Sequence, residues 1–464
     1  MKTTYLLLIT ITIICACSKE KLMDDTGAKI NLSVSSISFD TLFTTTGSAT
    51  RLFKIFNPNN GRLQLNEISL RGLSNSYFHF NADGKGGKSV NDVFIEANDS
   101  IYVFLTVNID PNSDTLPFIV SDTLDIKYNG NIESLPVSAW GQNARFLRAK
   151  VIYSDTTWTN EVPIVIIGGA LVADGITLKI ERGTRIYMHA DAPLIIDGTL
   201  EAIGDGGDSL NIEFQGDRLD RYYRDLPGSW PGIFFTSRSN GNVLRHVIIK
   251  NAYQGIVCEP QGNLVGYKLE MDACIIDNCY DAGIIGISSA IKATNCLVSN
   301  CGRNLLLVRG GKYAFTHCTV VSVSNVYIPH KQPVLTLSDY LRQEDAVEFG
   351  PLEAGFVNCI FWAINGSVED EVVALKEGTQ SFEANFTNCI WKFETRPSDC
   401  TTNGMIENEA PSFVSSSAEA GRYDFRLAEG SRGINEGIDA GIDKDLDGKA
   451  RTNTPDIGAF ESGF

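Results

Sequence analysis

The sequence predicts an all-β protein with an N-terminal immunoglobulin-like β-sandwich followed by a right-handed parallel β-helix. The first observation is a cysteine that recurs every 22 residues, at Cys274, Cys296 and Cys318. A second pair, Cys279 and Cys301, keeps the same step. A period of this length fits one coil of a β-helix, which contributes short strands to three sheets. The 42 glycines among 464 residues, together with short Val/Ile runs, also favour strands over helices.

Residues 1–17 are predicted to form a signal peptide. Lys2 supplies a positive end, and Tyr5 to Ala16 form an apolar stretch of 12 residues. As a helix this stretch reaches about 18 Å, too short for a hydrocarbon core of about 30 Å. Its end, Ile14 to Cys17, resembles the bacterial lipobox. The resemblance implies a lipid on Cys17 that anchors the chain to a membrane, with residues 18–28 as a flexible tether. A plain secretory signal with an incidental cysteine is the alternative.

Residues 29–145 are predicted to form the sandwich. Leu52–Phe56 and Ile101–Val107 are apolar strands, and Leu124–Tyr128 leads into Asn129-Gly130, a strong hairpin signal. About seven such strands in about 115 residues fit an immunoglobulin-like sandwich. The segments 53–57 and 137–141 resemble the Hydin-like immunoglobulin domains. That family implies a spacer or contact module without catalytic residues.

Residues 146–420 are predicted to form the β-helix, and residues 421–464 its C-terminal cap. Short strands here end at Gly, Asn or Asp, where the chain turns a corner. This part contains several short motifs: Ile212–Asp217, Pro227–Ile233, Asn251–Ile256, Asn358–Ile360, Asn388–Ile390, Tyr423–Leu427 and Asp456–Glu461. They resemble the pectate-lyase-like superfamily of right-handed β-helices, and within it a group of bacterial surface lipoproteins. That group has mostly no assigned activity, so the resemblance implies the fold rather than the chemistry.

Two insertions interrupt the repeat, and insertions on a solenoid often gather on its binding face. The first is Arg218–Ser229. The second, Tyr327–Leu352, lies in the 41-residue step from Cys318 to Cys359, which is nearly two coils long.

The cysteines are predicted to be buried thiols rather than disulfides. Removing Cys15 and Cys17 from the 11 cysteines leaves nine, an odd number. Asn278 and Asn300, each directly before a cysteine, are expected to form a row of amides that hydrogen-bond from coil to coil. Metal or redox chemistry is the alternative, but Cys-x4-Cys pairs without histidine lack the usual zinc spacing.

The first insertion is the most site-like stretch of the chain. Arginines can hold carboxylates in bidentate pairs, and aromatic rings can stack on the face of a sugar. The alternative is a loop held by its own Arg–Asp pairs, with the tryptophan covering a coil edge. The candidate ligand-binding residues are Arg218, Arg221, Tyr222, Tyr223, Arg224 and Trp230.

Two groups of carboxylates are further candidates. Lys268, Glu270 and Asp272 alternate along one strand, with Asp277 and Asp281 close by, and paired carboxylates can act as acid and base. A charged exposed strand face is the commoner explanation. Asp443, Asp445 and Asp447 precede Gly448 with the spacing of an EF-hand-like calcium loop. The twelfth position is Thr454, so calcium would need Asp456 or Glu461 to complete the site; an Asx-rich turn is the alternative.

The net charge of −17 argues against a nucleic-acid partner, whose phosphates require a basic stripe. We therefore expect a lipid-anchored protein of the outer membrane, exposed at the cell surface, that acts as a non-catalytic binding or scaffold protein. Its partner would be a glycan, a host protein or an outer-membrane protein. The alternatives are a polysaccharide lyase or glycoside hydrolase and an obligate subunit of a membrane assembly. No catalytic residue and no certain cofactor are assigned; calcium is the one candidate.

Overall fold

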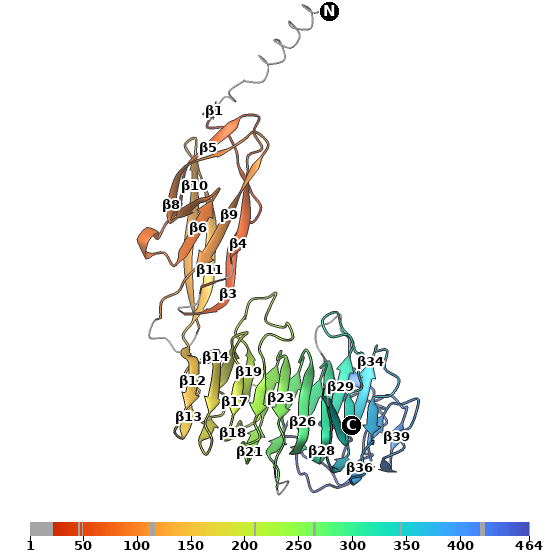
Figure 1. The fold of residues 1–464 in the computed structure, drawn as a ribbon. Helices are drawn as coiled ribbons and strands as arrows, with labels where there is room; N and C mark the ends of the chain where they lie inside the picture. Colours follow the sequence, from red (N-terminus) through yellow and green to blue (C-terminus); the bar gives the residue numbers. More distant parts are fainter. Residues whose placement is uncertain are drawn as a thin grey trace, which may run out of the picture. The chain divides into compact units, whose positions relative to one another are not determined.

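The computed structural model describes residues 22–44, 47–48, 50–111, 117–207, 210–262, 266–343, 346–417 and 423–463. The chain divides into two compact units, Met1–Asn143 and Ala144–Phe464, and both are built from strands (Figure 1). The predicted signal peptide and Cys17 lie outside the described residues. No helix among the described residues has the length and apolar character needed to cross a bilayer.

The first unit is a β-sandwich of two sheets that enclose one apolar core. One sheet has the order β1-β5-β10-β11-β3, with β8 paired to β5, and the other has the order β2-β4-β9-β6-β7. The strands of the first sheet are β1 (Leu22–Met23), β3 (Ile37–Phe43), β5 (Arg62–Leu70), β8 (Ser89–Ile95), β10 (Phe118–Tyr128) and β11 (Asn131–Gln142). Those of the second are β2 (Asn31–Leu32), β4 (Arg51–Phe56), β6 (Phe78–Ala82), β7 (Lys85–Gly87) and β9 (Ser100–Val107); the short 3-10 helix η1 spans Leu73–Asn75.

The predicted hairpin of the sandwich is confirmed. β10 and β11 pair antiparallel through the two-residue turn Asn129-Gly130. Both turn residues have positive φ, 45° and 80°, which a type I′ turn requires and which asparagine and glycine tolerate best. The local sequence therefore sets the register of the longest strand pair in this unit.

The second unit is a parallel β-helix whose coils build three parallel sheets, here called A, B and C. Sheet A contains β13 (Thr156–Trp158), β15 (Thr177–Ile180), β18 (Thr199–Ile203), β21 (Asn242–Arg245), β24 (Leu269–Asp272), β26 (Ala282–Thr294), β28 (Arg303–Thr316), β33 (Leu352–Val357), β36 (Phe382–Thr387) and β38 (Thr401–Asn403). Sheet B contains β12 (Arg145–Ile152), β14 (Ile164–Val172), β16 (Arg185–Met188), β19 (Ile212–Gly216), β22 (Val247–Lys250), β25 (Ile275–Asp277), β27 (Leu297–Ser299), β29 (Thr319–Val323), β34 (Ile360–Ile364), β37 (Ile390–Trp391) and β39 (Ile406–Glu407). Sheet C contains β17 (Leu194–Ile196), β20 (Ile233–Phe235), β23 (Gln254–Cys258), β30 (Leu335–Ser338) and β35 (Val372–Leu375), together with parts of β12, β14, β26 and β28, which bend between sheets.

The predicted stacking of the cysteines is confirmed. Ile275, directly after Cys274, pairs with Leu297, and the pairing continues through the strands that follow Cys318, Cys359 and Cys389. The thiols of this row are free and buried, and burial raises the pKa of Cys274, Cys296, Cys318 and Cys359 well above the ordinary value. They therefore act as small core side chains.

Each cysteine of this row follows a residue in the left-handed conformation. Ala273, Asn295, His317, Asn358 and Asn388 have φ between 47° and 53°. Asparagine adopts this conformation more readily than most residues because its short polar side chain bonds locally. The recurring Asn-Cys pair thus has a geometric cause: the asparagine turns the A–B corner and the cysteine fills the space inside it.

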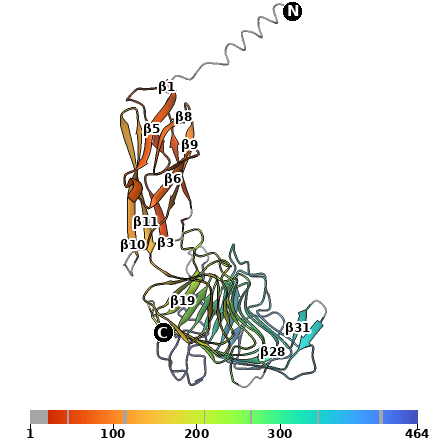
Figure 2. The ribbon, with the colours of Figure 1, turned by 60° about the vertical axis from the view of Figure 1, so that its left-hand side comes forward.

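The long step from Cys318 to Cys359 is one coil, not nearly two. β29 pairs directly with β34, so no further strand of sheet B lies between them. The additional residues include an antiparallel hairpin, β31 (Tyr340–Gln343) and β32 (Ala346–Phe349), which projects from the coils in Figure 2. Sequence length alone misjudged the coil number because an insertion adds residues without adding a rung.

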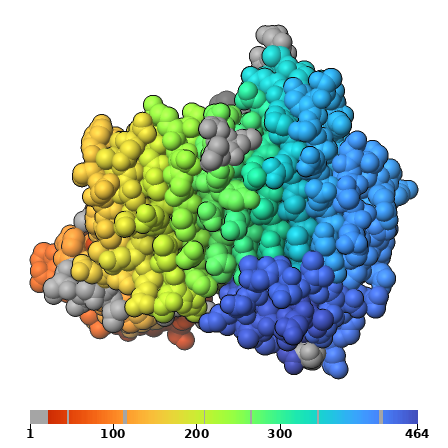
Figure 3. All heavy atoms as spheres, turned by 90° about the horizontal axis from the view of Figure 1, so that it is seen from below, coloured from red at the N-terminus to blue at the C-terminus, as the bar shows by residue number. Residues whose placement is uncertain are grey.

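The C-terminal segment lies along the side of the β-helix. It begins with β40 (Phe413–Ser415) and β41 (Asp424–Leu427), which pair antiparallel, and continues without strands to residue 463. In Figure 3 this segment, dark blue, rests against several coils. Its apolar side chains pack on outward-facing residues of sheet B: Phe425, Leu446, Ala459 and Phe460 in one cluster with Leu297, Val321 and Val323, and Leu427 and Ile457 in another with Ile360, Trp362 and Ile390. The segment therefore acts as a lateral cover of sheet B.

Candidate functional site

The corner between sheets B and C carries a row of asparagines, as expected from their spacing. Asn251, Asn278 and Asn300 all have positive φ, between 53° and 62°. The Asn278 amide donates to the side-chain oxygen of Asn251 at 2.8 Å, and the Asn300 amide donates to Asp277 at 3.0 Å. Asp277 is held within this corner, and burial raises its pKa. These bonds join neighbouring coils and explain both residue types structurally.

The arginines of the first insertion are largely paired within it. Arg218 contacts Asp220 at 2.8 Å and lies 3.9 Å from the ring centre of Tyr223. Arg224 contacts Asp225 at 3.0 Å, and Arg221 is exposed. The geometry of this loop matches the alternative in which it is held by its own Arg–Asp pairs.

Trp230 does not face solvent. Its side chain is 1 % exposed, its indole nitrogen donates to the carbonyl of Lys250 at 2.9 Å, and its ring stacks on Phe214. It is therefore a core residue of the coil. Tyr222 and Tyr223, in contrast, are 69 % and 46 % exposed and remain available for contact.

The insertion is fastened onto the B–C corner. The side-chain amide of Asn251 donates to the carbonyl of Arg224 at 2.6 Å, and that of Asn278 donates to Asp225 at 2.9 Å. A methyl group on Gly228 would lie 3.3 Å from the side chain of Tyr280. The predicted loop thus borders a second group of aromatic residues that sequence reasoning missed.

This second group is here called the tyrosine row: Tyr253, Tyr280 and Tyr327. The three side chains are 48 %, 53 % and 59 % exposed. The rings of Tyr253 and Tyr280 stack with their centres 5.7 Å apart. The available sequence signal was their 27-residue separation, which equals that of Asn251 and Asn278 and places them at equivalent points of adjacent coils.

A pocket of about 390 Å³ opens between Tyr280 and Tyr327. Its lining includes Gly302, where any larger residue would clash, since a Cβ would lie 2.4 Å from the carbonyl oxygen of Tyr280. The polar groups beside it are an Arg303–Asp281 ion pair and Gln254, whose amide donates to Asp281 at 2.7 Å. The other lining residues are Ile328, Pro329, Lys331 and Gln332.

A larger groove of about 750 Å³ separates the outer face of sheet A from the C-terminal segment. It brings together two candidate groups from the sequence: Glu270 and Asp272 on β24 face Asp443, Asp445 and Asp447 on the segment. Arg245 and Lys292 supply positive charge, and Lys292 lies 3.7 Å from Glu270.

Lys268 does not share the exposed face of β24 with Glu270 and Asp272. It precedes the strand at a corner and is fully buried, so the alternation of the strand does not apply to it. Its ammonium group donates to the carbonyls of Thr236 and Glu259, at 2.7 and 2.9 Å, and burial lowers its pKa. Lys268 therefore holds two turns together. It is not available as a cation beside Glu270 and Asp272, as the acid–base interpretation of this strand assumed.

The Asp-rich turn does not gather ligands for calcium. Both oxygens of Asp445 accept backbone N–H groups, from Lys449 and Glu461, at 2.7 Å each. Both oxygens of Asp447 accept from Arg426 at 2.8 Å. Among the described residues, no three acidic, histidine or cysteine side chains converge as a metal would require. The residues present do not fit a calcium ion.

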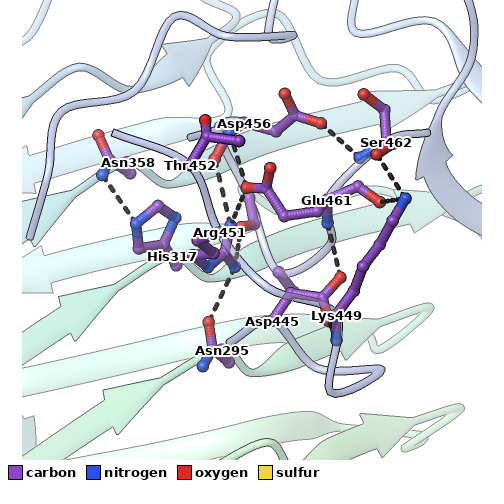
Figure 4. Close-up of polar contacts among 12 residues, drawn as sticks. Asn295, His317, Asn358, Asp445, Lys449, Arg451, Thr452, Asp456, Glu461 and Ser462 are labelled. Carbon is purple, nitrogen blue, oxygen red and sulfur yellow. Dashed lines mark hydrogen bonds and ion pairs between the residues drawn. The ribbon is translucent and has the colours of Figure 1, made fainter. Parts of the chain in front are cut away.

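The turn instead fastens the C-terminal segment to the A–B corner (Figure 4). Arg451, with only 2 % of its side chain exposed, contacts Glu461 at 2.7 Å and donates to Asn295 at 2.8 Å. Asn358 donates to the carbonyl of Ile438 and accepts from its N–H. The same asparagine lies 3.0 Å from the ring nitrogen of His317. The polar residues near the C-terminus thus have a structural role.

No family model matches this chain. No curated protein matches it either. Similarities to solved structures are weak. A family 123 glycoside hydrolase from Clostridium perfringens has a TM-score of 0.19 and 9% identity, over 26% of this chain and 30% of that chain, so the match spans less than a third of the hydrolase. A PapD-like domain of human CEP192 has a TM-score of 0.17 and 11% identity, over 27% and 92%. A protein of unknown function from Porphyromonas gingivalis has a TM-score of 0.19 and 12% identity, over 27% and 60%.

Proposed function

We propose that this chain is a non-catalytic, glycan-binding surface protein, held at the outer membrane by a lipid on Cys17. Its sandwich would act as a Hydin-like spacer, and its β-helix would belong to the pectate-lyase-like superfamily and present the binding surface. The observation that carries the glycan proposal is the stacked, exposed pair Tyr253 and Tyr280 beside a polar pocket.

Exposed tyrosines that gather on one surface are typical of interaction sites, because each ring offers apolar area and a hydroxyl group. A sugar ring suits them because one face is apolar and its hydroxyl groups need hydrogen-bond partners. The pocket supplies both features, with Tyr280 in its lining and Arg303 and Asp281 as polar groups; the Gln254 amide holds Asp281 from outside the pocket. The first insertion borders the same surface, which supports the sequence-based expectation of contact by Tyr222 and Tyr223.

The experiment is a glycan panel with the purified protein, read out for binding and for products. Tyr280→Ala and Tyr253→Ala should each weaken binding of any glycan retained. Tyr153→Ala is the matched control because Tyr153, in the same unit, is 77 % exposed and belongs to neither the row nor the pocket. Binding that is equal in all three variants, or no binding to any glycan, would contradict the proposal.

The groove beside sheet A favours a second candidate, a polysaccharide lyase or glycoside hydrolase. Carboxylates from two walls face one space there, as acid–base chemistry requires. The arginine that lines the groove is Arg245, which does not belong to the insertion, whereas Arg224 is bound at the B–C corner. Depolymerised product in the panel, lost in Glu270→Gln and Asp272→Asn, would establish this function in place of simple binding.

A further inference from the structure

The tyrosine row runs along the β-helix. Tyr253 and Tyr280 stand just before β23 and β26, which pair in sheet C, so these two tyrosines lie one coil apart, a step of about 4.8 Å. Tyr327 lies in the second insertion, between β29 and β30, and lines the pocket together with Tyr280 and with Gly302 of the next coil. The row therefore extends beyond the two coils of Tyr253 and Tyr280 and provides several contact positions.

The positions differ in what they offer. Tyr253 and Tyr280 stack on each other, so the two ring faces that are turned toward each other are covered. Tyr280 and Tyr327 both line the pocket, together with Gly302 directly before β28. A Cβ at Gly302 would meet the backbone carbonyls of Tyr280 and Asp281, so glycine is required where these two coils pack closely. A ligand seated in the pocket can therefore contact Tyr280 and Tyr327 together.

The charges beside the row are mostly compensated. Arg303 is paired with Asp281, and in the bordering insertion Arg218 is paired with Asp220 and Arg224 with Asp225. Lys331, which also lines the pocket, is exposed and is the lining cation without an ion pair among the described residues. The chain as a whole carries a net charge of −17. A polyanionic ligand would be repelled by the negative charge of the protein and would find few cations that are not already in ion pairs. A neutral polysaccharide would meet no such repulsion.

We infer that the row binds an extended, neutral polysaccharide that lies parallel to the axis of the β-helix and contacts Tyr253, Tyr280 and Tyr327 at successive positions. This inference rests on the proposed glycan-binding function. It adds the charge of the ligand, its direction and its minimum length.

The test measures affinity against chain length. Cello-, xylo- and malto-oligosaccharides of one to six sugars are titrated into the purified protein by calorimetry, beside oligogalacturonates of equal length. The neutral series that binds should gain affinity, by about tenfold or more from one sugar to four, and then level off. The oligogalacturonates should bind more weakly at equal length.

Variants show where each sugar contact lies. Tyr327→Ala should weaken the six-sugar ligand by about tenfold and remove much of the gain with length, and Tyr253→Ala should do the same from the other end. Tyr153→Ala should follow the unmodified protein, and thermal unfolding should confirm that each variant is folded. Equal affinity for one sugar and six, or tighter binding of the oligogalacturonates, overturns this inference and leaves glycan binding intact. No binding by any oligosaccharide overturns the proposed function itself.

Discussion

His317 makes the stability of the β-helix depend on pH, and the size of the effect follows from its burial. The side chain is 1 % exposed at the A–B corner, beneath the C-terminal segment. Burial, with a contribution from the charge of Arg451, lowers its pKa from 6.5 to about 3. The folded protein therefore holds the ring neutral at pH values where the unfolded chain has already bound a proton.

The direction follows from this difference. Above pH 6.5 both states are neutral, and the preference for the neutral ring contributes fully to stability. As the pH falls from about 6.5 towards about 3, the unfolded state gains a proton and this contribution is lost, at about 1.4 kcal/mol for each pH unit. At pH 5, about 1.5 units below the unfolded pKa, the loss is about 2 kcal/mol.

The assay is urea unfolding followed by tryptophan fluorescence at pH 7.5, 6 and 5, since Trp362 lies in the cluster under the segment. The matched variant is His317→Asn, because asparagine already occupies positions 295, 358 and 388 of the same row with positive φ. Between pH 7.5 and 5 the variant should lose about 2 kcal/mol less than the natural protein. Identical pH dependence in the two proteins would refute the reasoning.

Three further outcomes are expected. Arg451→Ala should destabilise the protein by about 3–5 kcal/mol, because Glu461 then stays buried without its cation. The double variant Arg451→Met, Glu461→Leu should recover most of this stability. A loss below about 1 kcal/mol for Arg451→Ala in urea unfolding would show that the pair is not buried in solution. Asn358→Ala should lower the free energy of unfolding by about 1–2 kcal/mol and make the C-terminal segment more sensitive to limited proteolysis. Asn358→Gly should restore the share of this stability that comes from the positive φ, but not the share from the side-chain hydrogen bonds. Equal resistance to the protease in the natural protein and both variants would contradict the role given to this corner. Alkylation of the native protein should label Cys400, the half-buried thiol among those described, far faster than the cysteine row, as judged by mass spectrometry; fast labelling of Cys296 or Cys318 would mean that the row is open to solvent.

Much of the architecture could be predicted from the sequence because repeated coils place the same side chain in the same surroundings. Cys274, Cys296 and Cys318 revealed the coil length, since a thiol that fits inside one coil fits inside the next. Asn129-Gly130 revealed a hairpin for an equally local reason, the need for positive φ at both turn positions. Structural features that depend on neighbouring residues, or on a strict repeat, can therefore be predicted from the sequence.

The site depended on contacts between residues far apart in the chain, and these only the tertiary structure decided. Tyr327 reaches the pocket through an insertion that breaks the period, so its distance from Tyr280 in the sequence gave no indication of their proximity. Glu270 and Asp443 meet across a groove because the C-terminal segment turns back along sheet B, a path set by apolar packing over many coils. The sequence suggested that Trp230 and Lys268 were surface residues, but both are buried among the coils around them. Burial is a property of the whole fold, and side-chain chemistry alone does not reveal it.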